Sequence, residues 1–97
     1  MSLPVIFRPE ADEDVEASRD YYERVAGLGR AFIEEVDKSV ERIKFMPLSY
    51  PRLIKNVRWC RVRRFPYVIY FRVKTDRIEV LGVLHGRRSP AVWKRRI

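Results

Sequence analysis

Histidine and cysteine are nearly absent from this chain of 97 residues, which contains one residue of each type. The single cysteine, Cys60, excludes an intrachain disulfide, and nothing in the cysteine usage indicates an oxidising compartment. One His, one Cys and scattered carboxylates do not supply three or four metal ligands at a recognisable spacing, so the sequence predicts no metal site. The glycine-rich loops that cradle nucleotide phosphates are also missing, and we expect no cofactor.

Long apolar runs are missing as well. No segment approaches the ~18 apolar residues of a membrane span. The N-terminus is acidic and lacks the basic-then-apolar pattern of a signal peptide, so we expect a cytoplasmic protein with no membrane partner. The apolar fraction of 46% argues against intrinsic disorder. A chain of this length can build one two-layer core, and we expect residues 1–97 to form one domain.

Acidic residues are scarce in the second half of the chain, where only Asp76 and Glu79 occur. Residues 51–97 hold 14 Lys and Arg against these 2 acids, a net charge of +12. Residues 1–50 hold 7 Lys and Arg against 11 acids, a net charge of −4. This asymmetry is typical of a chain whose second half meets a polyanion. The alternative, a solvated basic surface without a ligand, is disfavoured because so much like charge repels itself.

Apolar periodicity predicts two helices between one short strand and a group of three strands. The first helix begins at Pro9, carries acidic residues in its first turn and ends before Gly27. The second begins near residues 28–30 and stops at Pro47. Strands are predicted at 3–7, 57–63, 67–74 and 77–84, with a loop at 48–56. The predicted class is α+β with the order β-α-α-β-β-β, an antiparallel sheet carrying a helical hairpin packed on one face.

The run VLHGRRSPAVW at residues 83–93 follows the last predicted strand. It places the only histidine and an arginine pair after an apolar strand, where a glycine gives the backbone freedom. Six cations or strong donors fall within twelve residues, namely His85, Arg87, Arg88, Lys94, Arg95 and Arg96. Because Arg binds phosphate and carboxylate alike, this segment suggests a partner rich in one of them.

A cationic sheet face is the second candidate feature. The strand pattern places Arg61 and Arg63 on one face, where they are predicted to converge with Arg87 and Arg88. Trp59, Tyr67 and Tyr70 offer stacking surfaces, so this face suits single-stranded nucleic acid. An acidic protein surface would fit it equally well. The alternatives are a solvated strand face for the arginines and a core or edge-cover role for Trp59 and Trp93.

His85 has an unperturbed pKa near ~6.5 and is a candidate general acid or base. Cleavage of RNA by its 2′-OH requires a base, an acid for the leaving oxygen and cations around the phosphate. The sequence offers one histidine and no evident second acid–base group. The alternative is that His85 fixes the turn after the last strand by hydrogen bonding.

Two runs, VRRFPYVIYF at 62–71 and VLHGRR at 83–88, resemble the RelE/ParE superfamily, specifically its ParE-like branch. That branch comprises toxins of type II toxin–antitoxin systems and includes plasmid stabilisation proteins. The resemblance covers nearly the whole chain and extends to Ala11 and Asp14, which match an Ala-x-x-Asp start of the first helix. Ser89 stands where an Asp is common in the family.

The resemblance implies a toxin that inhibits DNA gyrase by binding, without enzymatic activity. It also implies a cognate acidic antitoxin and a toxin–antitoxin hetero-oligomer. The alternative is a RelE-like endoribonuclease that cuts mRNA on the ribosome, with Arg63, His85 and Arg87 as catalytic residues. A C-terminal catalytic Tyr of the RelE type is absent, since Trp93 is the only aromatic after His85. The residues expected to bind the target are Arg61, Arg63, His85, Arg87, Arg88, Trp93, Lys94, Arg95 and Arg96.

Overall fold

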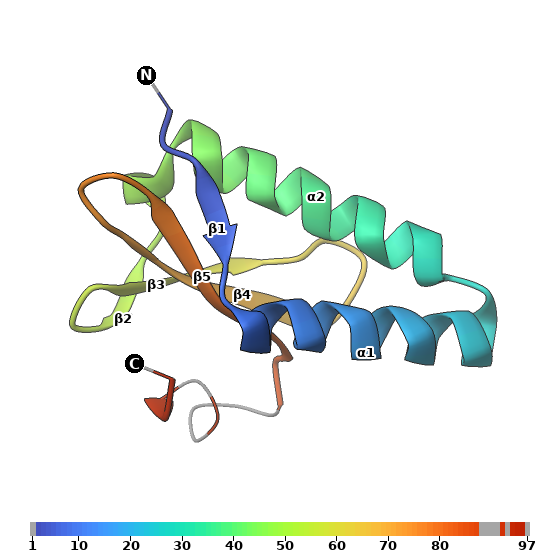
Figure 1. Ribbon diagram of the computed structural model, residues 1–97. Coiled ribbons are helices and arrows are strands. Elements are labelled where there is room, and N and C mark those ends of the chain that lie inside the picture. The colour runs from blue at the N-terminus through green and yellow to red at the C-terminus, as the bar shows by residue number, and fades with distance from the viewer. Residues whose placement is uncertain (1, 88–91, 93, 97) are drawn as a thin grey trace.

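The computed structural model describes residues 2–87, 92 and 94–96, which fold into a helical hairpin on one face of a five-stranded sheet (Figure 1). The α+β class and the hairpin packed on the sheet are as predicted. In chain order the elements are β1 Val5–Phe7, α1 Pro9–Ala26, α2 Gly29–Phe45, a 3₁₀ turn Pro47–Ser49, β2 Arg52–Ile54, β3 Val57–Arg61, β4 Tyr67–Val73 and β5 Ile78–His85.

The helix ends follow from local chemistry. Pro9 is the first residue of α1, where its missing N–H has no intrahelical partner to lose. Gly27 follows the last residue with φ 67°, a left-handed conformation that glycine adopts without strain. Its N–H donates to the Glu23 carbonyl at 3.0 Å, and the Leu28 N–H donates to the Tyr22 carbonyl at 3.1 Å. α2 begins at Gly29, within the predicted 28–30, and ends at Phe45, before Pro47, so the predicted bounds of both helices are confirmed.

The sheet has the order β1-β5-β4-β3-β2. β3, β4 and β5 form the predicted antiparallel meander, with Trp59 opposite Tyr70 and Tyr67 opposite His85. The prediction of a purely antiparallel sheet is wrong for β1, which pairs with β5 in parallel, Val5 opposite Ile78. Both helices and the strands β2, β3 and β4 lie between β1 and β5 in the chain, a connection long enough to join two parallel strands (Figure 1).

Two strand predictions need correction. The segment 48–56 was expected to be a loop, but it contains β2, an edge strand that pairs Arg52 with Arg58 and Ile54 with Val57. All three β2 residues are exposed, which explains the absence of an apolar alternation. The strand predicted to reach residue 63 ends at Arg61, and residues 62–66 turn the chain into β4.

The main core lies between the hairpin and the sheet. Tyr22 of α1 and Phe32 of α2 stack with centroids 5.5 Å apart, and the Phe65 ring packs edge-on against both, at 4.8 and 5.3 Å. Phe32 is completely buried. Val25, on the predicted apolar stripe of α1, is 55% exposed because the hairpin tip projects past the sheet (Figure 1).

A smaller apolar cluster covers the opposite face of the sheet. It consists of Val57, Tyr70, Leu81 and Leu84, against which Trp59, Val68 and Val92 pack. Trp59 is therefore partly core, in line with the alternative for that residue. Tyr70 is only 6% exposed and Tyr67 belongs to the hairpin-side core, so the predicted platform of three stacking rings does not exist.

Candidate functional site

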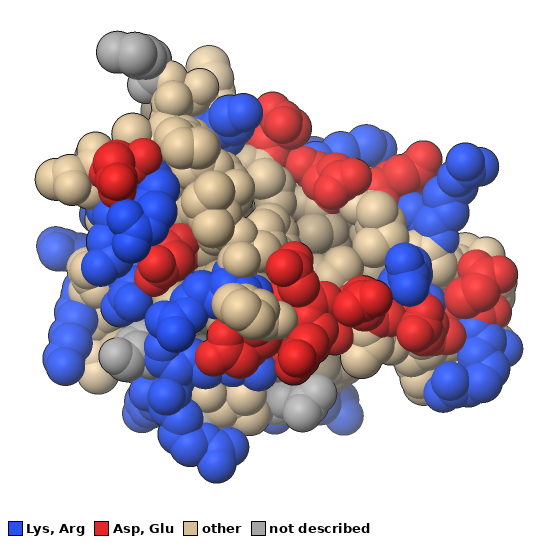
Figure 2. All heavy atoms as spheres, viewed as in Figure 1, with Lys and Arg blue, Asp and Glu red and all other residues tan. Residues whose placement is uncertain are grey.

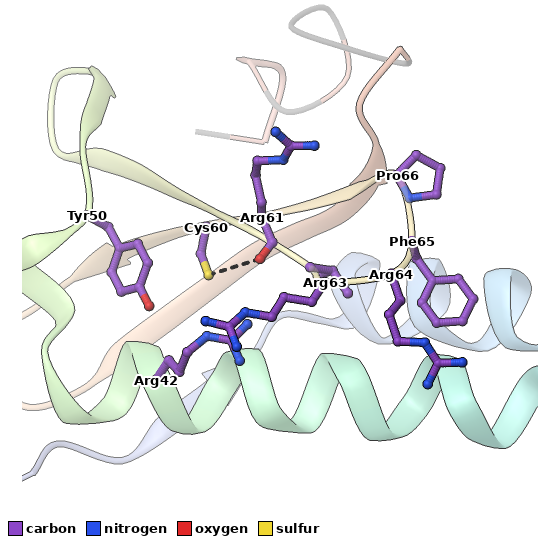
Figure 3. Close-up of a pocket in the computed structure, with 9 residues that line it drawn as sticks. Arg42, Tyr50, Cys60, Arg61, Arg63, Arg64, Phe65 and Pro66 are labelled. Atoms are coloured by element: carbon purple, nitrogen blue, oxygen red, sulfur yellow. Dashed lines mark hydrogen bonds between the residues drawn. The ribbon is translucent and has the colours of Figure 1, made fainter.

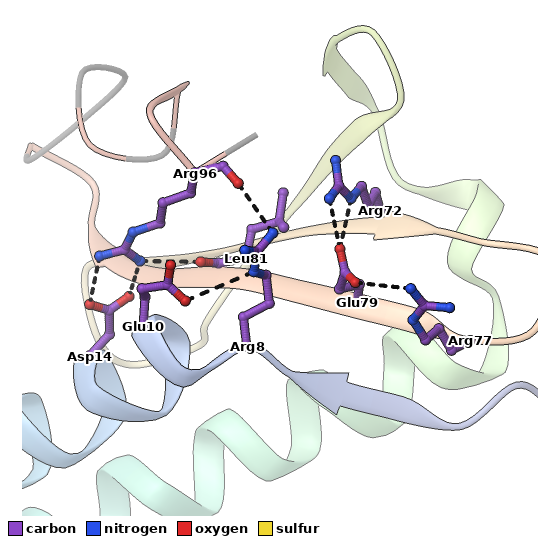
Figure 4. Close-up of polar contacts among 8 residues, drawn as sticks. All are labelled: Arg8, Glu10, Asp14, Arg72, Arg77, Glu79, Leu81 and Arg96. Carbon is purple, nitrogen blue, oxygen red and sulfur yellow. Dashed lines mark hydrogen bonds and ion pairs between the residues drawn. The ribbon is translucent and has the colours of Figure 1, made fainter.

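The described end of the C-terminal segment is fixed to the body of the protein by Arg96 (Figure 4). Its guanidinium donates to both carboxylate oxygens of Asp14, at 2.6 and 3.3 Å, and to the Leu81 carbonyl at 3.2 Å. The carbonyl of Arg96 accepts a hydrogen bond from Arg8 at 3.4 Å. The hydrogen bond to Asp14 is the main cause that raises the pKa of Arg96, which stays charged. Arg96 thus acts in the folded chain as an anchor.

Asp14 and Arg96 form hydrogen bonds with backbone groups of β5 that, among the described residues, no neighbouring strand pairs on that side. β1 accompanies β5 only from Ile78 to Val80. Beyond it, the Val83 N–H donates to Asp14 Oδ2 at 3.0 Å, while the Leu81 carbonyl accepts from Arg96. Gly82 lies between these groups, and a Cβ there would stand 2.8 Å from the Arg96 Nη1 atom. We call Asp14, Gly82 and Arg96 the anchor.

His85, the last residue of β5, lies on the hairpin side of the sheet. Its ring packs edge-on against Tyr67 with centroids 5.5 Å apart. Its Nδ1 accepts a hydrogen bond from the Arg87 N–H at 3.1 Å. The hydrogen bond that the alternative role of His85 in the turn predicts is therefore present. Within the described part of the chain, no hydrogen bond or ion pair joins the His85 ring to a carboxylate.

The prediction that Arg61 and Arg63 lie on one face is wrong, whereas the convergence of Arg61 with Arg87 and Arg88 stays a prediction. Because β3 ends at Arg61, Arg63 lies in the following loop and extends over α2, whereas Arg61 points the opposite way (Figure 3). Arg87 is exposed in the turn after β5. Lys94 and Arg95 are exposed near the anchored end, and Arg88 and Trp93 lie outside the described residues.

Arg63 instead lines a cavity of about 780 Å³ between the β3–β4 loop and α2 (Figure 3). The lining residues are Arg42, Tyr50, Cys60, Arg61, Val62, Arg63, Arg64, Phe65 and Pro66. Arg42 was missed from the sequence. The sequence feature that points to Arg42 is Ser39, a polar residue on the apolar stripe of α2. Its buried hydroxyl needs a hydrogen-bond partner, and it accepts a hydrogen bond from Arg42 Nη2 at 2.8 Å.

Charge is divided between the layers of the fold. Figure 2 shows acidic side chains along α1 and α2, with some basic ones among them and at the hairpin tip, and mostly basic side chains over the sheet edge and the C-terminal end. Within the sheet, Arg72 and Glu79 are opposite each other on β4 and β5 and pair at 2.8 Å. The acidic first half and the basic second half of the sequence thus become two differently charged regions of one surface.

The described residues contain no group of three or more His, Cys, Asp or Glu side chains that could hold a metal ion. No helix in this part of the chain is both long and apolar enough to cross a membrane.

Comparisons with known proteins point to one family. Residues 5–90 match the family model described as the ParE toxin of the type II toxin–antitoxin system parDE. The chain is 28% identical over 81 residues to Toxin ParE2 of two Mycobacterium tuberculosis strains, covering 81% of this chain and 77% of that protein. Its fold is similar to a solved structure described as the chromosomal ParDE TA system from P. aeruginosa. That match has a TM-score of 0.77 at 20% identity and covers 87% of this chain and 96% of that chain.

Proposed function

The chain belongs to the ParE toxin family of type II toxin–antitoxin systems, and from this premise we propose that it inhibits DNA gyrase by binding and is neutralised by a cognate acidic antitoxin. The observation that carries the choice of binding over RNA cleavage is the environment of His85. Its Nδ1 is occupied by the Arg87 N–H, and no carboxylate is bonded to its ring within the described residues.

A ribonuclease mechanism needs two groups that exchange protons near neutral pH, one on each side of the scissile phosphate. His85 is the only histidine. The arginines in the basic half remain charged at neutral pH, so they neutralise a phosphate but do not transfer its protons. A binding inhibitor has no such requirement, since cationic groups in a fixed arrangement are sufficient for recognition.

The target-binding surface in this proposal is the exposed cationic end of the chain. Arg87 and Lys94 are exposed, and the anchor at Arg96, two residues after Lys94, is held to α1 and β5. Arg88, Trp93 and Arg95 belong to the same proposal, whereas Arg63 lines a separate cavity and Arg96 is engaged by Asp14. A cation beside an anchored residue loses less conformational entropy on binding than one on a free tail. Because both gyrase and the ribosome are cytoplasmic, the proposal places the protein in the cytoplasm.

Two assays on one purified preparation separate the activities. We expect the protein to block supercoiling by purified gyrase and to leave mRNA intact in toe-printing on translating ribosomes. The paired substitution Arg87→Ala and Lys94→Ala should weaken the inhibition, because it removes exposed charge without disturbing the anchor. Arg24→Ala and Arg52→Ala, made together on exposed positions of α1 and β2, remove the same charge and should leave it unchanged.

Specific mRNA cuts that disappear in His85→Ala, with supercoiling unaffected, would contradict the proposal in favour of the endoribonuclease. Equal loss of gyrase inhibition in both double variants would contradict the placement of the binding surface at the C-terminal end.

The antitoxin is expected to be an acidic chain that folds onto this protein as a toxin–antitoxin hetero-oligomer. Its support is family membership together with the basic second half of the chain, to which an acidic segment is complementary. Induction of this chain alone should arrest bacterial growth, and co-expression of an acidic product of the adjacent gene should restore it. Persistent arrest, despite a co-purifying neighbour, would contradict neutralisation by that partner.

A further inference from the structure

The cavity between the β3–β4 loop and α2 is lined by four arginines and by no acidic residue among those described. Arg64 is partly neutralised, since its Nη1 lies 3.7 Å from the Glu35 carboxylate. Arg61 contributes to the lining but points its guanidinium away from the other two (Figure 3). Arg42 and Arg63 remain, and within the described residues neither forms an ion pair.

These two guanidinium groups approach the same place from different elements. Arg42 extends from the last turns of α2 and Arg63 from the loop, and both residues line the same cavity (Figure 3). Both charges act on the Cys60 thiol, opposing the burial that raises its pKa. Two like charges brought together without a counter-ion repel each other, so a bound anion would stabilise the arrangement.

The other polar groups of the cavity do not supply negative charge. Burial is the main cause that raises the pKa of the Cys60 thiol and of the Tyr50 phenol. Both groups are therefore neutral at pH 7, and the Cys60 thiol donates to the Arg61 carbonyl at 3.6 Å. The cavity thus presents two cations that form no ion pair among the described residues, and neither Tyr50 nor Cys60 opposes them with negative charge.

The Arg42 side chain is held in position by a hydrogen bond to another residue of α2. Ser39 is completely buried, its hydroxyl donates to the Glu35 carbonyl at 2.9 Å, and the same oxygen accepts from Arg42 at 2.8 Å. The loop that carries Arg63 is held by backbone hydrogen bonds, since the Val62 N–H donates to the Tyr67 carbonyl at 2.9 Å and the Gly86 N–H donates to the Pro66 carbonyl at 2.8 Å. Both cations are thus held on structured backbone before any ligand arrives.

We propose that this cavity binds a phosphate group, either free or carried by a nucleotide, between Arg42 and Arg63. A phosphate monoester carries a charge of about −1.5 to −2 at pH 7, which matches two guanidinium groups, whereas a carboxylate matches only one. Its several acceptor oxygens can accept hydrogen bonds from both arginines. The cavity of about 780 Å³ also has space for the group to which the phosphate is attached. This site is separate from the C-terminal surface and does not depend on gyrase inhibition.

The test is a titration of the full chain with sodium phosphate at constant ionic strength, followed by NMR of backbone amides and arginine Nε groups. We expect saturable shifts confined to the cavity residues. Affinity should fall about tenfold or more in Arg42→Gln and in Arg63→Gln, the loss expected for one charge-assisted contact. Arg52→Gln, on the exposed edge strand β2, is the matched control and should bind as the unmodified chain does.

Ser39→Ala tests the positioning of Arg42 while retaining both charges, and it should weaken phosphate binding with the dispersion of the amide spectrum retained. Titrations with adenosine monophosphate and with acetate identify the source of the anion. Tighter binding of the nucleotide assigns the site to a nucleotide phosphate, and equal affinities assign it to free phosphate. Acetate binding as tight as phosphate binding, shifts that do not saturate, or equal weakening in Arg52→Gln would each overturn the proposal.

Discussion

Replacing Gly82 by alanine tests the anchor without removing either of its charges. The new Cβ would lie 2.8 Å from Arg96 Nη1 and 3.4 Å from Asp14 Oδ2, so the flexible guanidinium has to move. Its displacement breaks hydrogen bonds of 2.6 and 3.3 Å to a carboxylate that is only 12% exposed. A hydrogen bond to a charged group contributes roughly 1.5–3 kcal/mol when buried, and an exposed ion pair under about 1. For this partly buried pair we expect a loss of about 1–2 kcal/mol.

A double-mutant cycle isolates the effect. The free energy of unfolding in urea would be measured for the unmodified chain, Gly82→Ala, Arg96→Ala and the double variant. Once Arg96 is shortened, the Cβ at position 82 no longer has a guanidinium to displace. The double variant should therefore be about as stable as Arg96→Ala alone, with a coupling energy of about 1–2 kcal/mol, the whole cost of Gly82→Ala. Gly86→Ala is the matched control, because its Cβ would meet only the Pro66 carbonyl at 3.7 Å.

Additive costs in this cycle would refute the reasoning, since they would mean that Gly82→Ala acts on the strand itself and not through Arg96. A cost in Gly86→Ala equal to that in Gly82→Ala would refute it as well. Faster proteolysis of the C-terminal segment in Gly82→Ala, with the rest of the chain intact, is the expected companion result.

Two further predictions concern titratable groups. Burial alone would raise the pKa of Glu79, but hydrogen bonds and charges from Arg72 and Arg77 outweigh it, and the pKa is lowered from 4.5. Ionised Glu79 therefore stabilises the fold above pH 4.5, and this contribution disappears as the pH falls through its folded pKa. Glu79→Gln should be less stable at pH 7 by roughly 1–2 kcal/mol, a difference that vanishes in acid, whereas exposed Glu34→Gln should show neither effect in urea denaturation. Cys60 is 2% exposed, and burial raises the pKa of its thiol. Alkylation of Cys60 should therefore be slow in the native protein and fast in urea. Rapid alkylation of the native protein would contradict the burial of this thiol.

Local chemistry in the sequence was sufficient for the helices and for most of the meander. Pro9 and Gly27 mark the ends of α1 because each acts on its own backbone, through a missing N–H and a positive φ. The strands over 67–73 and 78–85 are visible because their apolar residues are continuous. β2 is not visible, since three exposed residues carry no alternation, and it exists because β3 offers a partner.

The sequence by itself determined that the second half is basic, that one histidine follows the last strand and that the chain has the fold and motifs of a toxin family. Only the tertiary structure decided which charges act together. Arg96 pairs with Asp14 across 82 positions, and Arg42 and Arg63 line one cavity because β3 stops at Arg61. Hydrophobic periodicity involves residues that are close together in the sequence of one element, so it can be recognised from the sequence. An ion pair or a cavity instead depends on where two separate elements lie in space.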